Sequence, residues 1–358
     1  MKERIIGIDV ARALAVIGMI LVNFKVAFGD KGSSSLKFIL SLLEGKAAAT
    51  FVVLAGIGIA FLSKSAIKGE NSEKLKKIKS RLLKRSLFLF VVGLAYLPIW
   101  PADILHFYGV YMLITLLVLT SRRGKVFGLA TFLVVLFPVL MLVFNYDLNW
   151  DYKTYEYVNF WTPSGFVSNL MYNGFHPVVP WSAFMLIGLW FGRYDLRNTK
   201  FLVKSAWLSF GLFVFMIALS KLLILMLSEG SVETHQELQY ALGTSPMPPL
   251  PIYMISGSSF AIFIISVCIL IAKKLRSNPI INALKKTGQL ALTFYVAHVV
   301  IGMLPIYFLG QKRMGNYSIE FSTGYALIFS GACIAFAILW TKYKPIGPLE
   351  GIMRKITD

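Results

Sequence analysis

The stretch Arg4–Phe24, RIIGIDVARALAVIGMILVNF, is the first apolar run of the chain and decides its fold. About twenty residues at ~1.5 Å each cross a hydrocarbon core of ~30 Å, so the run predicts a membrane-spanning helix. Arg12 lies inside it, and an uncompensated charge in hydrocarbon costs at least ~3 kcal/mol. Asn23 follows about three turns later and roughly 16 Å further along the same helical face. Arg12 therefore faces either an anionic ligand or polar cavity, or simply Asp9, three residues earlier.

Composition gives the same class for the whole chain. Its 358 residues are 57% hydrophobic, whereas soluble proteins have about 45–50% apolar residues. We therefore expect an all-α polytopic membrane protein with one integral-membrane domain, residues 1–358, because no long polar segment could form a separate core. The net charge of +19 resides mainly in short loops between apolar runs, so we expect no nucleic-acid partner. Cys268 and Cys333 lie within apolar runs, and no metal-ligand spacing is present, so we expect no metal.

Apolar runs predict ten spans, with both termini in the cytoplasm. The loops near 64–85, 121–125, 193–204 and 273–286, with both ends of the chain, hold most of the 36 Lys and Arg, and such loops stay inside. The expected spans are approximately 5–28, 37–63, 82–100, 103–120, 126–145, 175–192, 202–227, 250–272, 288–309 and 320–341.

Polar side chains within the spans gather, by this topology, in the outer half of the bilayer, where each costs free energy to bury and so tends to face a cavity. His106 follows Asp103 at a spacing that puts both on one helical face, where the carboxylate can orient the imidazole. The other polar groups at this depth are Asn23, Glu44, Lys46, His176 and His298.

Two loops have features with two interpretations each. Lys64–Arg85 carries nine Lys or Arg and either anchors the topology on anionic membrane lipid or helps to bind a phosphorylated cytoplasmic ligand. Asn145–Gly174 is an aromatic outer loop that either forms a membrane-interface belt or stacks on a sugar or polyol. Its aromatic residues include Trp150, Tyr152, Tyr155, Tyr157 and Trp161.

Several motifs together resemble the YeiB-like proteins, bacterial membrane proteins grouped with the transmembrane acyltransferase superfamily. They are RIIGIDVARALAVIGMILVNF, LLEGKAAATFVVLAGIGIAF, DILHFYG, TGQLALTFYVAH and GPLEGIMRKIT. HPVVPWSAFMLIGLWFGR is also similar to bacterial relatives of the lysosomal heparan-glucosaminide N-acetyltransferase. The resemblance touches most of the chain and implies a multi-pass protein of the bacterial cytoplasmic membrane.

The resemblance further implies a bundle of ten or eleven helices that moves an acyl group, with acetyl as the expected one, from cytoplasmic acyl-CoA (acetyl-CoA) to an extracytoplasmic hydroxyl or amine acceptor. Members that acylate surface glycans have an Arg and, after ten intervening residues, a His in the first span. Here Arg12 and Asn23 occupy these positions. The heparan-glucosaminide branch also has Asn there and takes its His from the next loop, but this loop, KVAFGDKGSSSLKF, contains none. The base must therefore lie elsewhere.

Acyl transfer suggests a role for each group. The donor phosphates need a basic cytoplasmic mouth, and the candidates are Arg12, Lys84, Arg85 and Arg193. Asn23 is suited to stabilise charge on the thioester oxygen. A general base with a pKa near neutral favours His, first His106 oriented by Asp103, then His176, then His298. Glu44, Lys46 and Trp181 are the candidates for acceptor binding.

Two other functional classes are also compatible with the sequence. Polar groups along one pathway would also serve a transporter or channel for a small anionic or zwitterionic solute. A non-catalytic structural or regulatory membrane protein is the third interpretation. Expected partners are membrane lipid and an extracytoplasmic small-molecule or glycan acceptor. A homodimer is left open, because the small-residue face at 324–328 is a weak signal.

Overall fold

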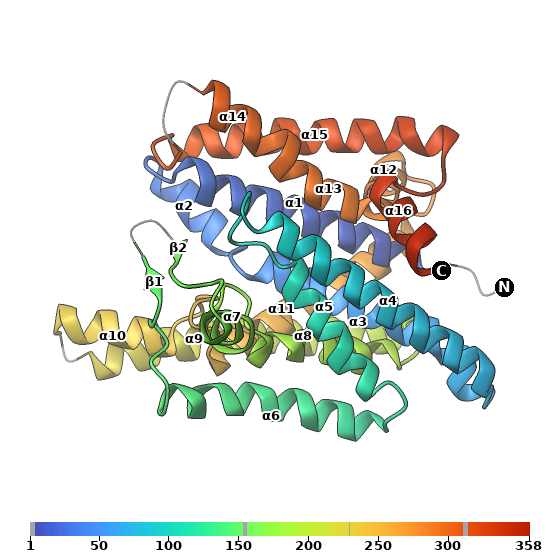
Figure 1. Ribbon diagram of the computed structural model, residues 1–358, viewed down its shortest axis with the longest axis horizontal. Helices are drawn as coiled ribbons and strands as arrows, with labels where there is room; N and C mark the ends of the chain where they lie inside the picture. The colour runs from blue at the N-terminus through green and yellow to red at the C-terminus, as the bar shows by residue number, and fades with distance from the viewer. Residues whose placement is uncertain (1–3, 153–155, 229, 311–313) are drawn as a thin grey trace. The chain divides into compact units, whose positions relative to one another are not determined.

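The structure is a computed structural model that describes residues 4–152, 156–228, 230–310 and 314–358 (Figure 1). Within these ranges the chain is almost entirely helical, with one short antiparallel pair, β1 (Trp150–Asp151) and β2 (Glu156–Tyr157). Seven described helices are long and apolar enough to cross a membrane, or eight if the bent pair Pro163–Asn173 and Val178–Gly192 forms one span. The predicted all-α polytopic membrane fold is confirmed.

Every predicted span overlaps a helix, but the count of ten stays a prediction. α4 (Ser72–Tyr96) is long enough to cross a membrane but has a basic first half, and α5 (Leu105–Leu117) is only 13 residues long. The ninth predicted span is broken into α13 (Ala291–Ala297), the π-helical segment η2 (His298–Met303) and α14 (Leu304–Leu309).

The chain divides into two compact units, and each is described by itself. Unit 1 comprises Met1–Phe51, Leu196–Trp207 and Ala261–Ile356, and unit 2 comprises Val52–Asp195, Leu208–Phe260 and Thr357–Asp358. The helices that contribute residues to both are α3 (Lys46–Lys68), α9 (Thr199–Leu227), α11 (Pro251–Lys274) and, with its last residue Thr357, α16 (Pro348–Thr357).

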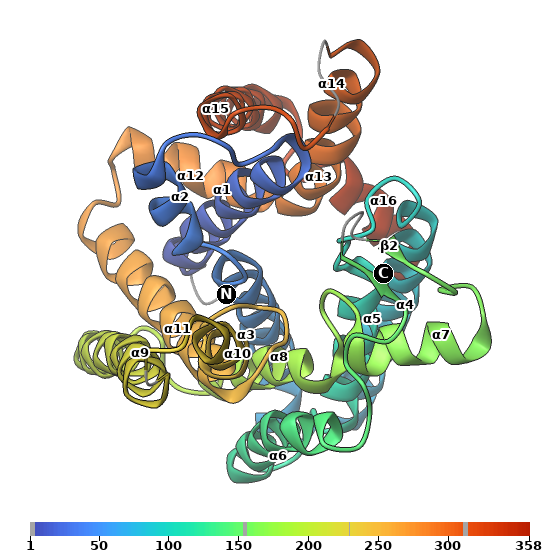
Figure 2. The same cartoon turned by 90° about the vertical axis from the view of Figure 1, so that its left-hand side faces the viewer.

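Unit 1 is built around α1 (Ile6–Phe28), the first apolar run. α1 packs against α12 (Pro279–Gln289), α13 and α15 (Ile319–Tyr343), which lie around it in Figure 2. The contact with α12 is backbone to backbone: a Cβ on Gly288 would lie 1.8 Å from the carbonyl oxygen of Asp9. Only glycine permits this approach, which fixes α12 beside the charged turn of α1. The remaining elements are α2 (Ser34–Ser41) and α16 (Pro348–Thr357).

Unit 2 has α8 (Val178–Gly192) at its centre. All but two residues of α8 are buried, and it packs against α5 and α6 (Arg123–Met141), while α4 packs along α5. A helix that is apolar all round belongs in a core, as here. The other elements of this unit are α7 (Pro163–Ser168), the π-helical segment η1 (Asn169–Asn173) and α10 (Val232–Leu242).

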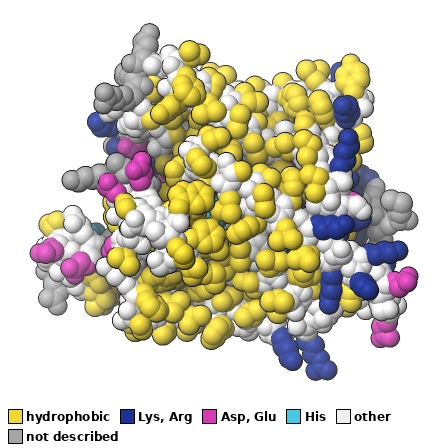
Figure 3. All heavy atoms as spheres, in the orientation of Figure 1, with side chains coloured by type: hydrophobic (Ala, Val, Ile, Leu, Met, Phe, Trp, Pro, Cys, Tyr) yellow, Lys and Arg dark blue, Asp and Glu magenta, His cyan; other side chains and the backbone are white. Residues whose placement is uncertain are grey.

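Large apolar side chains cover much of the surface, as Figure 3 shows for one face. They are frequent on α6, α9 and α15, where α9 is among the least buried of the candidate spans. A soluble monomer rarely exposes a large contiguous apolar patch, whereas hydrocarbon solvates such a surface. These faces therefore fit contact with lipid. Examples are Phe132, Val135, Trp207, Leu225, Leu327 and Ile328.

Candidate functional site

Asn23 and His298, two polar residues of the membrane-spanning part of unit 1, are in contact. Asn23 of α1 lies 2.9 Å from His298 of η2, measured from the amide nitrogen to Nε2. His298 Nδ1 contacts the carbonyl oxygen of Tyr295, which can only accept a hydrogen bond. Nδ1 therefore carries the proton, and Nε2 presents its lone pair to the Asn23 amide, which donates. A neutral imidazole with its lone pair at Nε2 is the form a general base requires.

The local backbone at His298 is unusual. η2 begins at this residue, and π-helical turns inside α-helices occur frequently at functional sites. The imidazole is fully buried, and Phe24 lies alongside it with ring centroids 6.3 Å apart. Asn23 is only partly buried. A group that approaches the pair would therefore meet the Asn23 amide before the imidazole.

A second feature fixes the start of the helix that carries His298. The carboxylate of Glu350 in α16 accepts hydrogen bonds from the backbone N–H groups of Leu292 and Thr293, at 2.8 and 3.2 Å, and from the Thr293 hydroxyl at 2.6 Å. These are first-turn groups of α13, which have no partner within the helix. The motifs GPLEGIMRKIT and TGQLALTFYVAH, separate in the sequence, thus form one contact.

Asp9 and two arginines form an ion cluster near the first turn of α1. The Asp9 carboxylate, 1% exposed, accepts from Arg4 at 2.6 and 2.8 Å and from Arg12 at 2.9 Å. Two guanidinium groups share one carboxylate, so the cluster keeps a net positive charge. Among the described residues Arg12 makes no other hydrogen bond, and about a quarter of its side chain is exposed. The structure therefore contains the Asp9 pairing and leaves most of Arg12's donors available.

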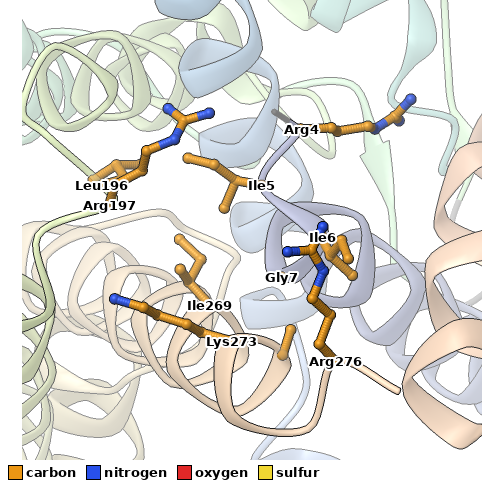
Figure 4. A pocket seen from close by; sticks show the side chains of 10 residues that line it. Arg4, Ile5, Ile6, Gly7, Leu196, Arg197, Ile269, Lys273 and Arg276 are labelled. Carbon is orange, nitrogen blue, oxygen red and sulfur yellow. The ribbon is translucent and has the colours of Figure 1, made fainter. Parts of the chain in front are cut away.

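A basic cavity of about 320 Å³ lies at this end of α1 (Figure 4). Ile6 and Gly7 of α1 border it, and the N-cap residue Ile5 provides no side-chain cap, so the positive end of the helix dipole faces this region. A phosphate is the kind of group that such a site binds. The basic residues of its lining come from three segments of unit 1: Arg4, Arg197, Lys273 and Arg276.

Sequence reasoning missed this cavity. Arg197, Lys273 and Arg276 belong to basic loops that were interpreted as topology signals only. Nothing in their spacing indicates that they converge, because the segments lie more than 70 residues apart along the chain. Arg4 offered the one signal, since it stands five residues before the buried Asp9 that it binds.

The predicted acceptor-side residues of unit 1 have different environments. Lys25 forms an ion pair with Glu44, so Glu44 is engaged within the protein. Lys46, at the start of α3, is 3% exposed. The carboxylate of Glu44 lies near enough to interact with the charge of Lys46. A role of Lys46 in ligand binding therefore stays a prediction.

Unit 2 brings the other predicted histidines together. His106 Nδ1 is 3.4 Å from the Asp103 carboxylate, which also accepts from the backbone N–H of Leu105 at 2.7 Å. Gly93 lets α4 approach the start of α5 closely, because a Cβ there would lie 2.2 Å from the backbone nitrogen of His106. The long contact to Nδ1 indicates that Asp103 caps the start of α5 more firmly than it orients the imidazole. His106 Nε2 is buried and has no partner among the described residues.

The neighbours of His106 are aromatic. Phe107 contacts both imidazoles, with ring centroids 3.9 Å from His106 and 6.1 Å from His176. Trp181 packs edge to face on His176 at 4.6 Å. His106 and Trp181 are fully buried, so neither has surface open to a ligand in this structure.

The predicted donor-binding residues are divided between the two units. Arg12 belongs to unit 1, whereas Lys84, Arg85 and Arg193 belong to unit 2. Lys84 is exposed on α4, and Arg85 donates to the Asp358 side chain at 2.8 Å. Arg193 donates to the carbonyl oxygens of Ser121 and Leu119. Burial, and secondarily the nearby cation of Arg123, lowers the pKa of Arg193.

The fold defines a polytopic membrane protein, and comparison with known families identifies its class further. The chain belongs to the family of the heparan-α-glucosaminide N-acetyltransferase catalytic domain, whose model matches residues 4–229. Residues 195–358 match a family described as a protein of unknown function, DUF418. The two matches confirm the YeiB-like, acyltransferase-related resemblance. Over its whole length the chain is 22% identical to an uncharacterised 39.9 kDa protein in the amylase 3′ region of Bacillus acidopullulyticus, covering 94% of that protein.

Proposed function

We propose that this protein is a membrane-embedded acyltransferase that moves an acetyl group from cytoplasmic acetyl-CoA to a hydroxyl or amine outside the membrane. The observation that carries the proposal is the arrangement along α1. The basic cavity borders Gly7, and the Asn23–His298 pair stands sixteen residues later, roughly 24 Å along the helix. A donor with phosphates at one end and a thioester at the end of an extended arm fits this pair of sites.

The phosphates of the donor would bind in the basic cavity, where Arg4, Lys273 and Arg276 supply charge-assisted hydrogen bonds. Arg12, close to Arg4 through the shared Asp9, would add a further cation on the same helix. The predicted residues Lys84, Arg85 and Arg193 are not among the residues that line this cavity.

The chemistry at the pair would be a direct transfer. His298 Nε2 accepts the proton of the acceptor hydroxyl or amine as its oxygen or nitrogen attacks the thioester carbonyl. The Asn23 amide, released from Nε2, donates to the carbonyl oxygen as it becomes negative. The C–S bond then breaks, the CoA sulfur leaves as thiolate, and the proton held by His298 protonates it. No acyl-enzyme is formed, because the acceptor itself attacks.

A test with two readouts separates donor binding from transfer. Protein purified in detergent should retain CoA or acetyl-CoA, detectable by mass spectrometry after denaturation. In liposomes, acetyl-CoA supplied to the cytoplasmic face of the protein should release free CoA thiol. The release should be faster when a hydroxyl or amine acceptor is present at the extracytoplasmic face. Absence of both saturable acetyl-CoA binding and acceptor-dependent thiol release would contradict the proposal.

A further inference from the structure

A second cavity, in unit 2, has aromatic walls. It measures about 330 Å³, close to the lower limit for small-molecule sites and therefore suited to one ring. Prolines and aromatic rings supply most of its lining, together with one carboxylate and one amide. The lining residues are Leu97, Pro98, Pro101, Trp150, Glu156, Tyr157, Phe160, Trp161, Asn169 and Phe175.

Hydrogen bonds hold two of the aromatic walls in place. Trp150 Nε1 donates to the carbonyl oxygen of Asn173 at 2.6 Å, and the Tyr157 hydroxyl donates to the Asn173 side chain at 2.8 Å. The Asn173 amide in turn donates to the carbonyl oxygens of Tyr146 and Leu148. Trp150 and Tyr157 are thus fixed to one buried residue, with their rings edge to face at 5.3 Å. Such walls are formed before any ligand arrives.

The polar groups of the cavity are Asn169 and Glu156. Asn169 is 5% exposed and lines the cavity, so its side-chain amide can both donate to and accept from a ligand hydroxyl. Glu156 is exposed at the rim, and none of the ten lining residues is basic.

We propose that this cavity binds the ring of a sugar that carries no acidic group. A pyranose ring has an apolar C–H face, which suits the exposed face of Trp161 and the other aromatic rings, and hydroxyl groups that an amide and a carboxylate can bind. The carboxylate of Glu156, with no cation among the described lining residues, disfavours phosphorylated sugars and uronic acids. The inference does not depend on acyl transfer, because it concerns binding only.

The place of the cavity on unit 2 agrees with a sugar met outside the cell. Leu97, Pro98 and Pro101 directly follow α4, whereas the basic residues of α4 lie in its first half. Arg81 and Arg85 are thus separated from the cavity by several turns of one helix. With the basic end of α4 inside, as the charge rule predicts, the cavity opens on the outer side. Tyr155 of the same loop lies outside the described residues.

The alternative is an aromatic belt at the membrane interface. In a belt the rings point outward to the lipid headgroups. Trp161, 70% exposed, fits either role, but Trp150 and Tyr157 are hydrogen-bonded inward to Asn173. This inward fixation favours a binding site.

The test measures sugar binding to the full chain in detergent, without donor. Saturation-transfer NMR with cellobiose, maltose and N,N′-diacetylchitobiose should detect binding of at least one, with the strongest transfer to ring C–H protons. Trp161→Ala should weaken that binding about tenfold, because one stacking face is lost. Trp207→Ala is the matched control, since Trp207 is equally exposed, at 71%, on α9 and outside the cavity.

Two further variants examine the polar groups. Asn169→Leu should weaken binding of the same sugar, and Glu156→Gln should raise the affinity for digalacturonic acid relative to the neutral sugars. The proposal is overturned if none of the three neutral disaccharides binds at millimolar concentration, or if Trp161→Ala changes binding no more than Trp207→Ala does. Since Trp161 is exposed, its loss should leave folding intact, which thermal unfolding checks.

Discussion

Glu350 and Thr293, 57 residues apart, form a double contact in which the carboxylate of Glu350 accepts from both the hydroxyl and the backbone N–H of Thr293. The contact caps α13, and η2 with His298 follows directly on α13. Glu350 thus acts as a positioning residue for the candidate base, although it lies far from the imidazole in sequence. A carboxylate at a helix N-terminus also interacts favourably with the helix dipole.

Removal of this cap should destabilise the fold. Glu350→Ala leaves the first N–H groups of α13 without their acceptor, and hydrogen bonds to charged groups contribute about 1.5–3 kcal/mol each. We expect a clear fall in the melting temperature in detergent. Glu237→Ala, on the exposed surface of α10, should change it little. Glu350→Ala combined with Thr293→Val should cost less than the sum of the two changes, and strict additivity would show that the contact contributes nothing.

Arg12 should bind the donor in addition to forming its ion pair with Asp9. Arg12→Ala should therefore weaken acetyl-CoA binding more than it lowers thermal stability, measured by titration and by unfolding of the same preparation. The control is the double change Asp9→Asn with Arg12→Gln, which removes both charges of the pair. Restored stability together with unchanged donor affinity would mean that Arg12 only neutralises Asp9.

The basic cavity gives a charge test of the donor site. Lys273→Glu reverses one cation of the lining, and we expect acetyl-CoA affinity to fall by at least about tenfold and to lose part of its salt dependence. Lys84→Glu on α4 makes the same reversal outside the cavity and should have little effect. Equal losses in the two variants would indicate general attraction to a basic surface and no specific site.

The fold could be predicted because hydrophobic length is a local property. Arg4–Phe24 became α1, and each later apolar run overlaps a helix. The breaks could not be predicted, since the apolar run around His298 continues without any change of pattern where the π-helical turn begins. The same holds for α4, whose basic first half continues as one helix into its apolar second half.

The candidate site could be predicted only in part. Asn23 and His298 were each identified as polar groups in hydrocarbon, because a polar residue inside an apolar run can be recognised in the sequence. Their contact could not be predicted, because the two residues lie 275 positions apart and no spacing rule relates them. The same separation hid the basic cavity, where Arg4 and Arg276 line one space from opposite ends of the chain.

The orientation in the membrane remains a prediction from the distribution of Lys and Arg. Reporter fusions after Lys68 and at the C-terminus should report a cytoplasmic location, and fusions within 228–249 should report an external one. An external C-terminus would mean that the number of spans is odd. An external location of the fusion after Lys68 would place the basic start of α4 outside and the aromatic cavity on the side opposite to that proposed.

The identity of the general base is the sharpest test of the chemistry. Three histidines are candidates, and sequence reasoning placed His106 first. The structure favours His298, because its Nδ1 is held by the Tyr295 carbonyl and its Nε2 faces Asn23, whereas the contact of His106 with Asp103 is long. Loss of a general base typically lowers the rate by ~10²–10⁴.

We therefore expect His298→Ala to nearly abolish acetyl transfer while acetyl-CoA still binds through the cavity at the other end of α1. Asn23→Ala should lower the transfer rate as well, because the developing charge on the thioester oxygen loses its donor. His106→Ala and His176→Ala should reduce the rate less, through packing around Phe107. The assay follows single-turnover release of CoA thiol from each variant at saturating donor. Near wild-type turnover in His298→Ala, with a loss in His106→Ala, would assign the base to unit 2 and leave the Asn23–His298 contact a structural one.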